Sequence, residues 1–144
     1  MLSTAWLIPV FPLCAMALIV LVTHRSRALS AGISITAIAL GFLYAWAIAF
    51  QVWFEPQVAQ FSFDWLNLGP SMTIPLGIRI DGLSAMMLIV VTTVALMVQV
   101  YSLGYMHGDS RYGWFYAVLS LFAASMLALV LADNFLLLYF AWEL

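Results

Sequence analysis

Glu143 is the residue of this sequence whose type and position are best suited to chemistry. It lies nine residues after Asn134, in an apolar run predicted to be a helix, which places it about 13 Å along the helix axis and near the middle of a bilayer. A carboxylate at that depth costs several kcal/mol, so it must be protonated, paired with a cation or solvated by internal water. Tyr139, one turn earlier on the same face, could donate a hydrogen bond to it. A carboxyl group whose pKa responds to the movement of a nearby cation suits a proton relay.

The other acidic residues have simpler interpretations. Asp81 and Asp133 each stand before an apolar run, where a short acidic side chain typically caps a helix. Asp109 and Arg111, two residues apart in a polar segment, are interpreted as a solvated pair. The predicted helices contain no cation at the depth of Glu143, and we expect its partner to come from outside these 144 residues. No nucleophile–base pair accompanies Glu143, which argues against covalent catalysis.

Metal, cofactor and nucleic-acid sites find no support in the sequence. His24 and His107 lie in loops without a second ligand nearby, and Cys14, the sole cysteine, is interpreted as a small packing residue. The sequence has no GxGxxG, phosphate loop or CxxC motif, so we expect no cofactor site in this chain. Net charge is −2 and lysine is absent, which excludes nucleic acid as a partner on electrostatic grounds. Polar residues within the apolar runs are predicted to hydrogen-bond between helices or to line a hydrated path: Ser84, Thr92, Thr93, Gln99, Ser120 and Ser125.

Composition identifies the lipid bilayer as the environment of the chain. Apolar residues make up 67% of the sequence and charged residues only 7%, and the mean hydropathy is +1.13. The four basic and six acidic side chains fall between long apolar runs or at their edges, except Glu143. A soluble domain of this size needs far more polar surface.

The apolar runs predict an all-α polytopic membrane protein with about five transmembrane helices in a single membrane domain, residues 1–144. The predicted helices cover residues 3–23, 31–53, 82–102, 113–131 and 134–144. The first is not a secretory signal, because basic residues follow it rather than precede it. The fifth has 11 residues, roughly 16 Å and half a crossing. We therefore expect the sequence to be the amino-terminal piece of a longer protein.

The arginines predict the orientation. Arg25, Arg27 and Arg111 fall in loops on one side of the membrane, and Arg79 stands alone on the other. Positive charge accumulates in cytoplasmic loops. We therefore expect a multi-pass protein of a bacterial-type inner membrane, with its amino terminus and its long loop outside.

The long loop, residues 54–80, contains two runs with period-two alternation. The first places Phe61, Phe63 and Trp65 on one face, and the second extends from Met72 to Ile80. The turn-like segment at 67–70 separates them, so the pattern predicts a β-hairpin with one apolar face. A lone hairpin is marginal in water, so this face must rest on the helices or on a neighbouring subunit. An irregular loop with chance alternation is the alternative.

Several segments in the second half of the chain together resemble a known family. They are D-G-L-S at 81–84, Y-S-L-G-Y-M-H-G-D at 101–109, L-A-D-N-F at 131–135 and W-E at 142–143. This ordered set resembles the L-type, antiporter-like subunit of respiratory complex I, the proton-translocating NADH–quinone oxidoreductase. The resemblance covers about residues 76–144 well, whereas the first 75 residues agree in layout more than in motif.

The resemblance implies that the chain supplies the first helices of a much longer subunit. In that family the glutamate that matches Glu143 pairs with a lysine of a later helix and takes part in proton transfer. The partners implied are the other membrane subunits of the complex. NADH, flavin, iron–sulfur clusters and quinone belong to those partner subunits, so the chain alone is expected to be inactive.

Two other functions remain open. The large subunit of a multisubunit cation/proton antiporter, or of a membrane-bound hydrogenase, shares the fifth-helix glutamate, although the segment at 101–109 resembles the complex I chain more closely. A non-conducting scaffold that only holds an assembly together is the third hypothesis.

Overall fold

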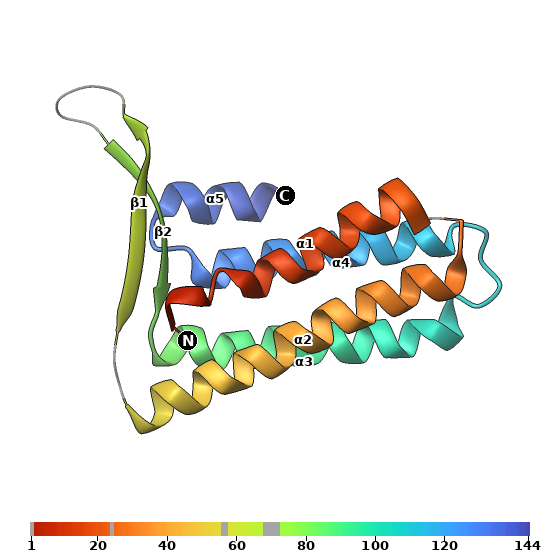
Figure 1. Cartoon of the computed structure of the whole chain (residues 1–144), viewed down its shortest axis with the longest axis horizontal. Helices are drawn as coiled ribbons and strands as arrows, with labels where there is room; N and C mark the ends of the chain where they lie inside the picture. The colour runs from red at the N-terminus through yellow and green to blue at the C-terminus, as the bar shows by residue number, and fades with distance from the viewer. Residues whose placement is uncertain (1, 24, 56–57, 68–72) are drawn as a thin grey trace.

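A computed structural model describes residues 2–23, 25–55, 58–67 and 73–144. In chain order its elements are η1 (Leu2–Thr4), α1 (Leu7–Leu18), η2 (Ile19–Thr23), α2 (Arg27–Phe54), β1 (Ala59–Asn67), β2 (Thr73–Ile80), α3 (Gly82–Tyr105), α4 (Tyr112–Leu131) and α5 (Phe135–Glu143). Within the described residues, four helical stretches are long and apolar enough to cross a membrane. They lie side by side along the long axis, with the two strands across one end and α5 beside α4 (Figure 1). The predicted fold class is confirmed.

The helix ends differ from the hydropathy pattern by a few residues. α2 begins at Arg27 and α3 continues to Tyr105, each beyond the purely apolar run. Hydropathy marks the part that sits in hydrocarbon, whereas the helical hydrogen bonds continue into the interface; Ser30 N–H, for example, donates to the Ser26 carbonyl at 3.0 Å. The first crossing is less regular than predicted, because a 3₁₀ turn precedes α1 and the π-helical turn η2 follows it.

The helices pack through stripes of buried residues spaced alternately by three and four. On α2 the stripe is Ala31, Ser34, Ile38, Gly41, Ala45, Ile48 and Val52. On α3 the buried residues are Ala85, Leu88, Thr92, Gln99 and Ser102. An average spacing of 3.5 residues keeps one face toward a nearly antiparallel neighbour, as in coiled coils. Small side chains dominate the stripe on α2, and they let helix backbones approach closely in lipid.

A polar layer interrupts this apolar packing. Ser34 and Ser120 hydroxyls share a buried hydrogen bond of 2.6 Å between α2 and α4, and the Tyr116 hydroxyl donates to the Gln99 carbonyl oxygen at 2.9 Å. The prediction of an interhelical bond is thus confirmed for Ser120. The Gln99 side-chain amide is 0% exposed and finds no hydrogen-bond partner among the described residues.

Three other hydroxyls, those of Thr92, Thr93 and Ser125, bond within their own helix and not between helices, so a role in lining a hydrated path stays a prediction for them. Thr92 donates to the Leu88 carbonyl at 2.7 Å, and Thr93 and Ser125 donate to carbonyls four residues earlier in the same way. In an apolar bundle the nearest acceptor is the carbonyl of the preceding turn.

The two strands form the predicted antiparallel hairpin, so the irregular-loop alternative is wrong. Ala59 pairs with Ile80 at one end and Asn67 with Thr73 at the other, with a register shift between Asp64 and Leu66. The turn proposed at 67–70 and the predicted apolar position Met72 fall mostly outside the described residues. The loop between α2 and α3 is therefore a β-hairpin, held by backbone pairing between the two alternating runs.

β2 rests on the junction between α4 and α5, as the apolar face of the hairpin requires. Ile80 is fully buried, Ile78 forms an isolated bridge with Ala132, and Asp133 N–H donates to the Gly77 carbonyl at 3.4 Å. The Gly77 α-carbon lies against the Asp133 carboxylate, with no room for a side chain. β2 is therefore packed into the helical core, whereas Phe61 of β1 is 40% exposed.

Replacing Gly77 with Ala should destabilise this junction, because the new methyl group would overlap the Asp133 carboxylate. Overpacking of this kind costs about 1–3 kcal/mol. Thermal unfolding of the complete protein in detergent measures the effect. Gly82→Ala is the matched control, because a methyl group there meets no atom within 4 Å. Equal unfolding temperatures for the two variants would show that the contact is unimportant.

Candidate functional site

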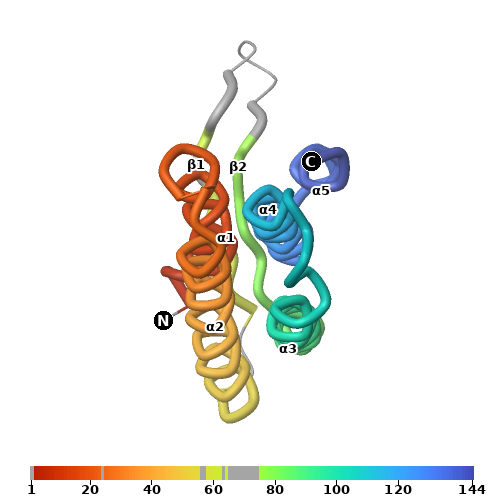
Figure 2. The backbone as a smooth tube through the Cα atoms, turned by 90° about the vertical axis from the view of Figure 1, so that its right-hand side faces the viewer, coloured from red at the N-terminus to blue at the C-terminus, as the bar shows by residue number. Residues whose placement is uncertain are grey.

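Glu143 is the last residue of α5, a helix of nine residues that packs on α4. At 1.5 Å per residue the helix brings its carboxyl group about 13 Å inward from the hairpin end, to a level about halfway along the 20-residue helix α4. Ala141, which is 5% exposed, is the buried contact of α5 with α4. Figure 2 shows α5 beside α4 on the side away from α2. The distance of Glu143 from the hairpin end is thus determined by the residue at which α5 begins.

A groove of about 460 Å³ lies between the hairpin and α5, with Glu143 at its inner end. Its lining is Pro75, Leu76, Asn134, Leu136, Leu137, Tyr139, Phe140 and Glu143. Tyr139 and Glu143 share this surface, as the helical spacing predicts. The Glu143 side chain is exposed and forms no hydrogen bond or ion pair with any described residue. Its cationic partner therefore stays a prediction.

Asn134 determines where α5 begins. Its side-chain oxygen accepts a hydrogen bond from Leu137 N–H at 2.8 Å, which is the N-cap arrangement. Its amide nitrogen donates to the Pro75 carbonyl at 2.9 Å and to Asp133 Oδ1 at 2.7 Å. One side chain thus joins the hairpin, the end of α4 and the first turn of α5. Sequence reasoning placed the cap at the neighbouring Asp133 and did not foresee the bond to β2, which joins residues 59 positions apart.

Asp133 is not a cap, contrary to the prediction. The helix starts one residue later than that interpretation requires, and Asn134, with φ −140° and ψ 158°, is the extended residue that precedes it. The Asp133 carboxylate instead accepts from Asn134 and lies against Gly77. Because Gly77 has no side chain, the carboxylate can occupy the space over β2.

Asp81 is the N-cap of α3, as predicted. Its carboxylate accepts from Ser84 N–H at 2.8 Å, and the Arg79 guanidinium lies 3.7 Å away. The backbone hydrogen bond from Ser84 lowers the pKa of Asp81, although burial acts in the opposite direction. Asp81 is therefore a structural cap at the hairpin end of α3.

The remaining candidates are structural. Asp109 Oδ1 accepts from Arg111 N–H at 2.6 Å, so the predicted pair is a local turn contact made through the Arg111 backbone. The His107 carbonyl accepts from Arg27 at 3.0 Å, while His24 lies outside the described residues. Within the described ranges, no three His, Cys, Asp or Glu side chains group as metal ligands. Cys14 is exposed, so its predicted role as a packing residue is wrong. An apolar residue of a membrane helix can face lipid as well as protein.

Four long apolar helices within the described residues, with a hairpin packed on one end of them, are typical of a multi-pass membrane protein. Residues 65–116 match the family described as NADH-ubiquinone oxidoreductase (complex I), chain 5 N-terminus. The predicted resemblance is confirmed: the chain is related to the amino-terminal part of chain 5 of NAD(P)H-quinone oxidoreductase.

The similar proteins agree on this relation. The chain is 38% identical to NAD(P)H-quinone oxidoreductase chain 5 of Synechocystis sp., over 97% of this chain and 21% of the relative. It is 35% identical to the chloroplastic subunit 5 of Anthoceros angustus, over 97% and 20% respectively. Among solved structures, a chain of the Mrp complex from Dietzia sp. matches with a TM-score of 0.66 and 27% identity, over 94% of this chain and 14% of that one. The chain thus spans about a fifth of the length of its curated relatives.

Replacing Asn134 separates its two roles. Asn134→Ser keeps an oxygen that can cap α5 but removes the donor to Pro75, whereas Asn134→Ala removes both. Loss of the cap costs about 1 kcal/mol, so we expect the order of thermal stability to be parent, then Ser, then Ala. Thermal unfolding of the complete protein measures this order. If the Ser variant equals the parent, the bond to the hairpin contributes nothing.

Proposed function

We propose that this chain is the amino-terminal part of a proton-translocating membrane subunit of NAD(P)H–quinone oxidoreductase, with Glu143 as a proton relay. The observation that carries the proposal is the position of Glu143, a carboxyl group deep along a membrane helix and at the inner end of an apolar groove. Such a group binds a proton when it is desolvated and releases it when a cation approaches. The relation to chain 5 subunits supplies the context in which this proton exchange would be coupled to electron transfer.

Electron transfer would take place in partner subunits. Chain 5 relatives are named as parts of an oxidoreductase, and the sequence has no nucleotide or cluster-binding motif. NADH or NADPH, flavin, iron–sulfur clusters and quinone would therefore bind in other subunits. The chain alone would be inactive, because the proton path needs groups beyond these helices.

The exposed face of α5 supports a position inside a larger assembly. Phe135 is 90% exposed and Trp142 is 72% exposed. Aromatic surface of this extent is covered by lipid or by further protein in a membrane complex. Contact with protein on this face would also bring a cation to Glu143, which the described residues do not supply.

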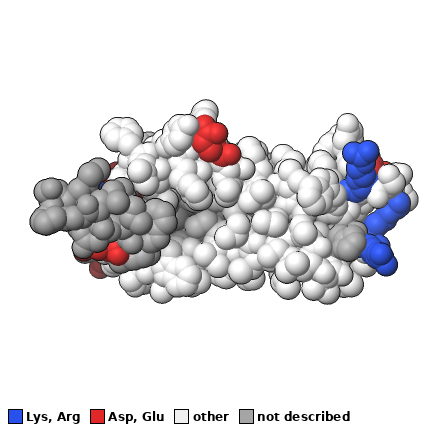
Figure 3. Space-filling view, turned by 90° about the horizontal axis from the view of Figure 1, so that it is seen from above, with Lys and Arg blue, Asp and Glu red and all other residues white. Residues whose placement is uncertain are grey.

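The charge distribution supports the proposed orientation. Figure 3 shows basic side chains gathered at the end of the bundle opposite the hairpin, where Arg25, Arg27 and Arg111 lie in or beside the loops. By the positive-inside rule that end would face the cytoplasm, in what we propose is a bacterial-type inner membrane. The amino terminus and the hairpin would then face outward.

The large subunit of a cation/proton antiporter, or of a membrane-bound hydrogenase, is the second candidate. The likeness to a chain of the Mrp complex supports it, whereas the higher identities to chain 5 relatives favour the first candidate. Genes for electron-input subunits beside this one would support the oxidoreductase, and genes for small antiporter subunits would support the alternative.

Replacing Glu143 with Gln in the complete complex tests the relay. Gln cannot exchange a proton, so proton pumping should fall about tenfold or more, measured as acidification of vesicles on addition of NADH. Asp109→Asn is the control, because this exposed acid lies at the opposite end of the bundle and should leave pumping unchanged. Parental pumping by a normally assembled Glu143→Gln complex would favour the scaffold hypothesis instead.

A further inference from the structure

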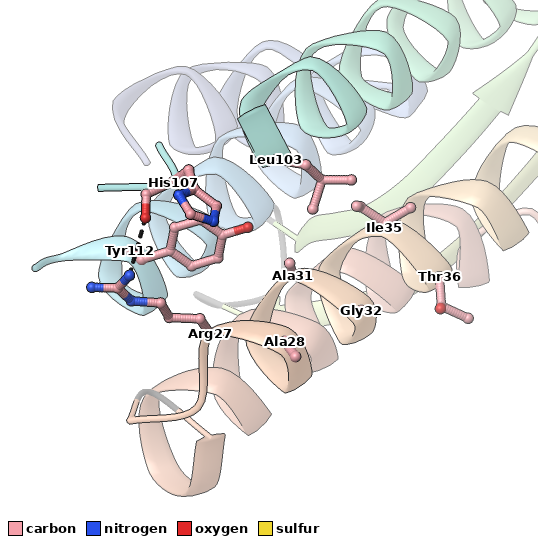
Figure 4. A pocket seen from close by; sticks show the side chains of 9 residues that line it. All are labelled: Arg27, Ala28, Ala31, Gly32, Ile35, Thr36, Leu103, His107 and Tyr112. Atoms are coloured by element: carbon pink, nitrogen blue, oxygen red, sulfur yellow. Dashed lines mark hydrogen bonds between the residues drawn. The ribbon is translucent and has the colours of Figure 1, made fainter. Parts of the chain in front are cut away.

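A hollow opens at the arginine end of the bundle, between α2, α3 and the start of α4. It measures about 490 Å³ and is lined by Arg27, Ala28, Ala31, Gly32, Ile35, Thr36, Leu103, His107 and Tyr112. Figure 4 shows Arg27, His107 and Tyr112 at one end of this hollow and α2 along its length, with Thr36 at the other end. The hollow therefore has a charged mouth and an apolar floor.

Arg27 supplies the charge at the mouth. Its side chain is exposed, and one guanidinium nitrogen donates to the His107 carbonyl at 3.0 Å. A guanidinium carries five N–H donors, so others remain for an anion. The contact with His107 also holds Arg27 over the hollow instead of leaving it free in solvent (Figure 4). Arg27 is the first residue of a membrane-spanning helix, which is the level of lipid headgroups.

A second hollow, of about 430 Å³, lies on the other flank of α2, against α1. It is lined by Phe11, Cys14, Ala15, Leu18, Ala28, Leu29, Gly32, Ile33, Thr36, Ala37 and Leu40. The two hollows share Ala28, Gly32 and Thr36, which follow one another at single helical turns. A side chain added at Gly32 would meet no atom within 4 Å. α2 thus presents a low ridge with an apolar groove on each side and Arg27 at its head.

We propose that this surface binds an anionic phospholipid, with the phosphate at Arg27 and one acyl chain in each groove. Arg27 lines the first groove, and the second groove begins at the next residues of α2, Ala28 and Leu29. One cation beside two apolar grooves matches the single phosphate and two acyl chains of such a lipid. The arginine end would face the cytoplasmic leaflet, whose anionic lipids are attracted to basic residues at the membrane surface. The alternative occupant is a transmembrane helix of another subunit. Such a helix could pack on the small residues of the ridge, but it would leave the charge of Arg27 without a partner. The site is independent of Glu143, which lies on the α5 side of the bundle.

The charge is tested by replacing Arg27 with Gln in the complete complex, reconstituted in bilayers of equal parts phosphatidylglycerol and phosphatidylcholine. Phosphatidylglycerol that stays bound after detergent extraction is counted by mass spectrometry. Loss of one arginine at the surface should weaken retention about fivefold. Arg25→Gln is the matched control, because Arg25 is also exposed at this end but lines neither hollow. Equal losses in the two variants would show only a general attraction to the basic end and would overturn the proposal.

The grooves are tested by Gly32→Leu, which adds an apolar side chain on the ridge that both grooves share, where a Cβ atom meets no protein atom within 4 Å. Gly104→Leu is the control, because a Cβ atom there also meets nothing within 4 Å and Gly104 lines neither hollow. We expect Gly32→Leu alone to abolish retention of phosphatidylglycerol while the complex remains assembled. Unchanged retention would overturn the proposal, and so would release of a partner subunit, which would identify the ridge as a helix–helix contact.

Discussion

The side chain of Asn134 is the connection on which the arrangement of the candidate site depends. Its oxygen caps α5 by accepting from Leu137 N–H, and its nitrogen at the same time donates to the Pro75 carbonyl of β2. In hydrocarbon, the free N–H groups at a helix start must find partners within the protein. Asn134 meets that need and at the same time fixes α5 to the hairpin. The depth of Glu143 follows, because nine helical residues begin from a fixed point.

The hairpin has a mechanical role that its composition does not show. β2 supplies the Pro75 and Gly77 carbonyls to the α4–α5 junction and buries Ile80 against the helices. Asp81, directly after the strand, then caps α3. A single strand thus connects the starting points of two membrane helices, and a shift in its register would displace both. The strand therefore joins the hairpin end of α3 to the α4–α5 junction.

The sequence was sufficient to predict the crossings, the hairpin and the cap at Asp81, because each is a local pattern of hydropathy, alternation or spacing. It was not sufficient for Asp133 or Cys14. The role of Asp133 depends on the empty space above Gly77, a residue far away in the chain. Cys14 was assigned to the interior because it is apolar, yet lipid and protein interiors attract apolar side chains equally. The Asn134–Pro75 bond and the Arg27–His107 bond were missed for the same reason as Asp133: each joins distant segments through a backbone carbonyl, which every residue type carries.

α5 differs from the other helices in what holds it. α4 buries ten of its residues, among them Tyr116 and Leu127, whereas Ala141 is the buried residue of α5. Within the described residues α5 packs on α4, and the cap and the bond to β2 add directional contacts at the hairpin end of the helix. These contacts fix where α5 begins, and the helical rise then determines how far from the hairpin Glu143 lies.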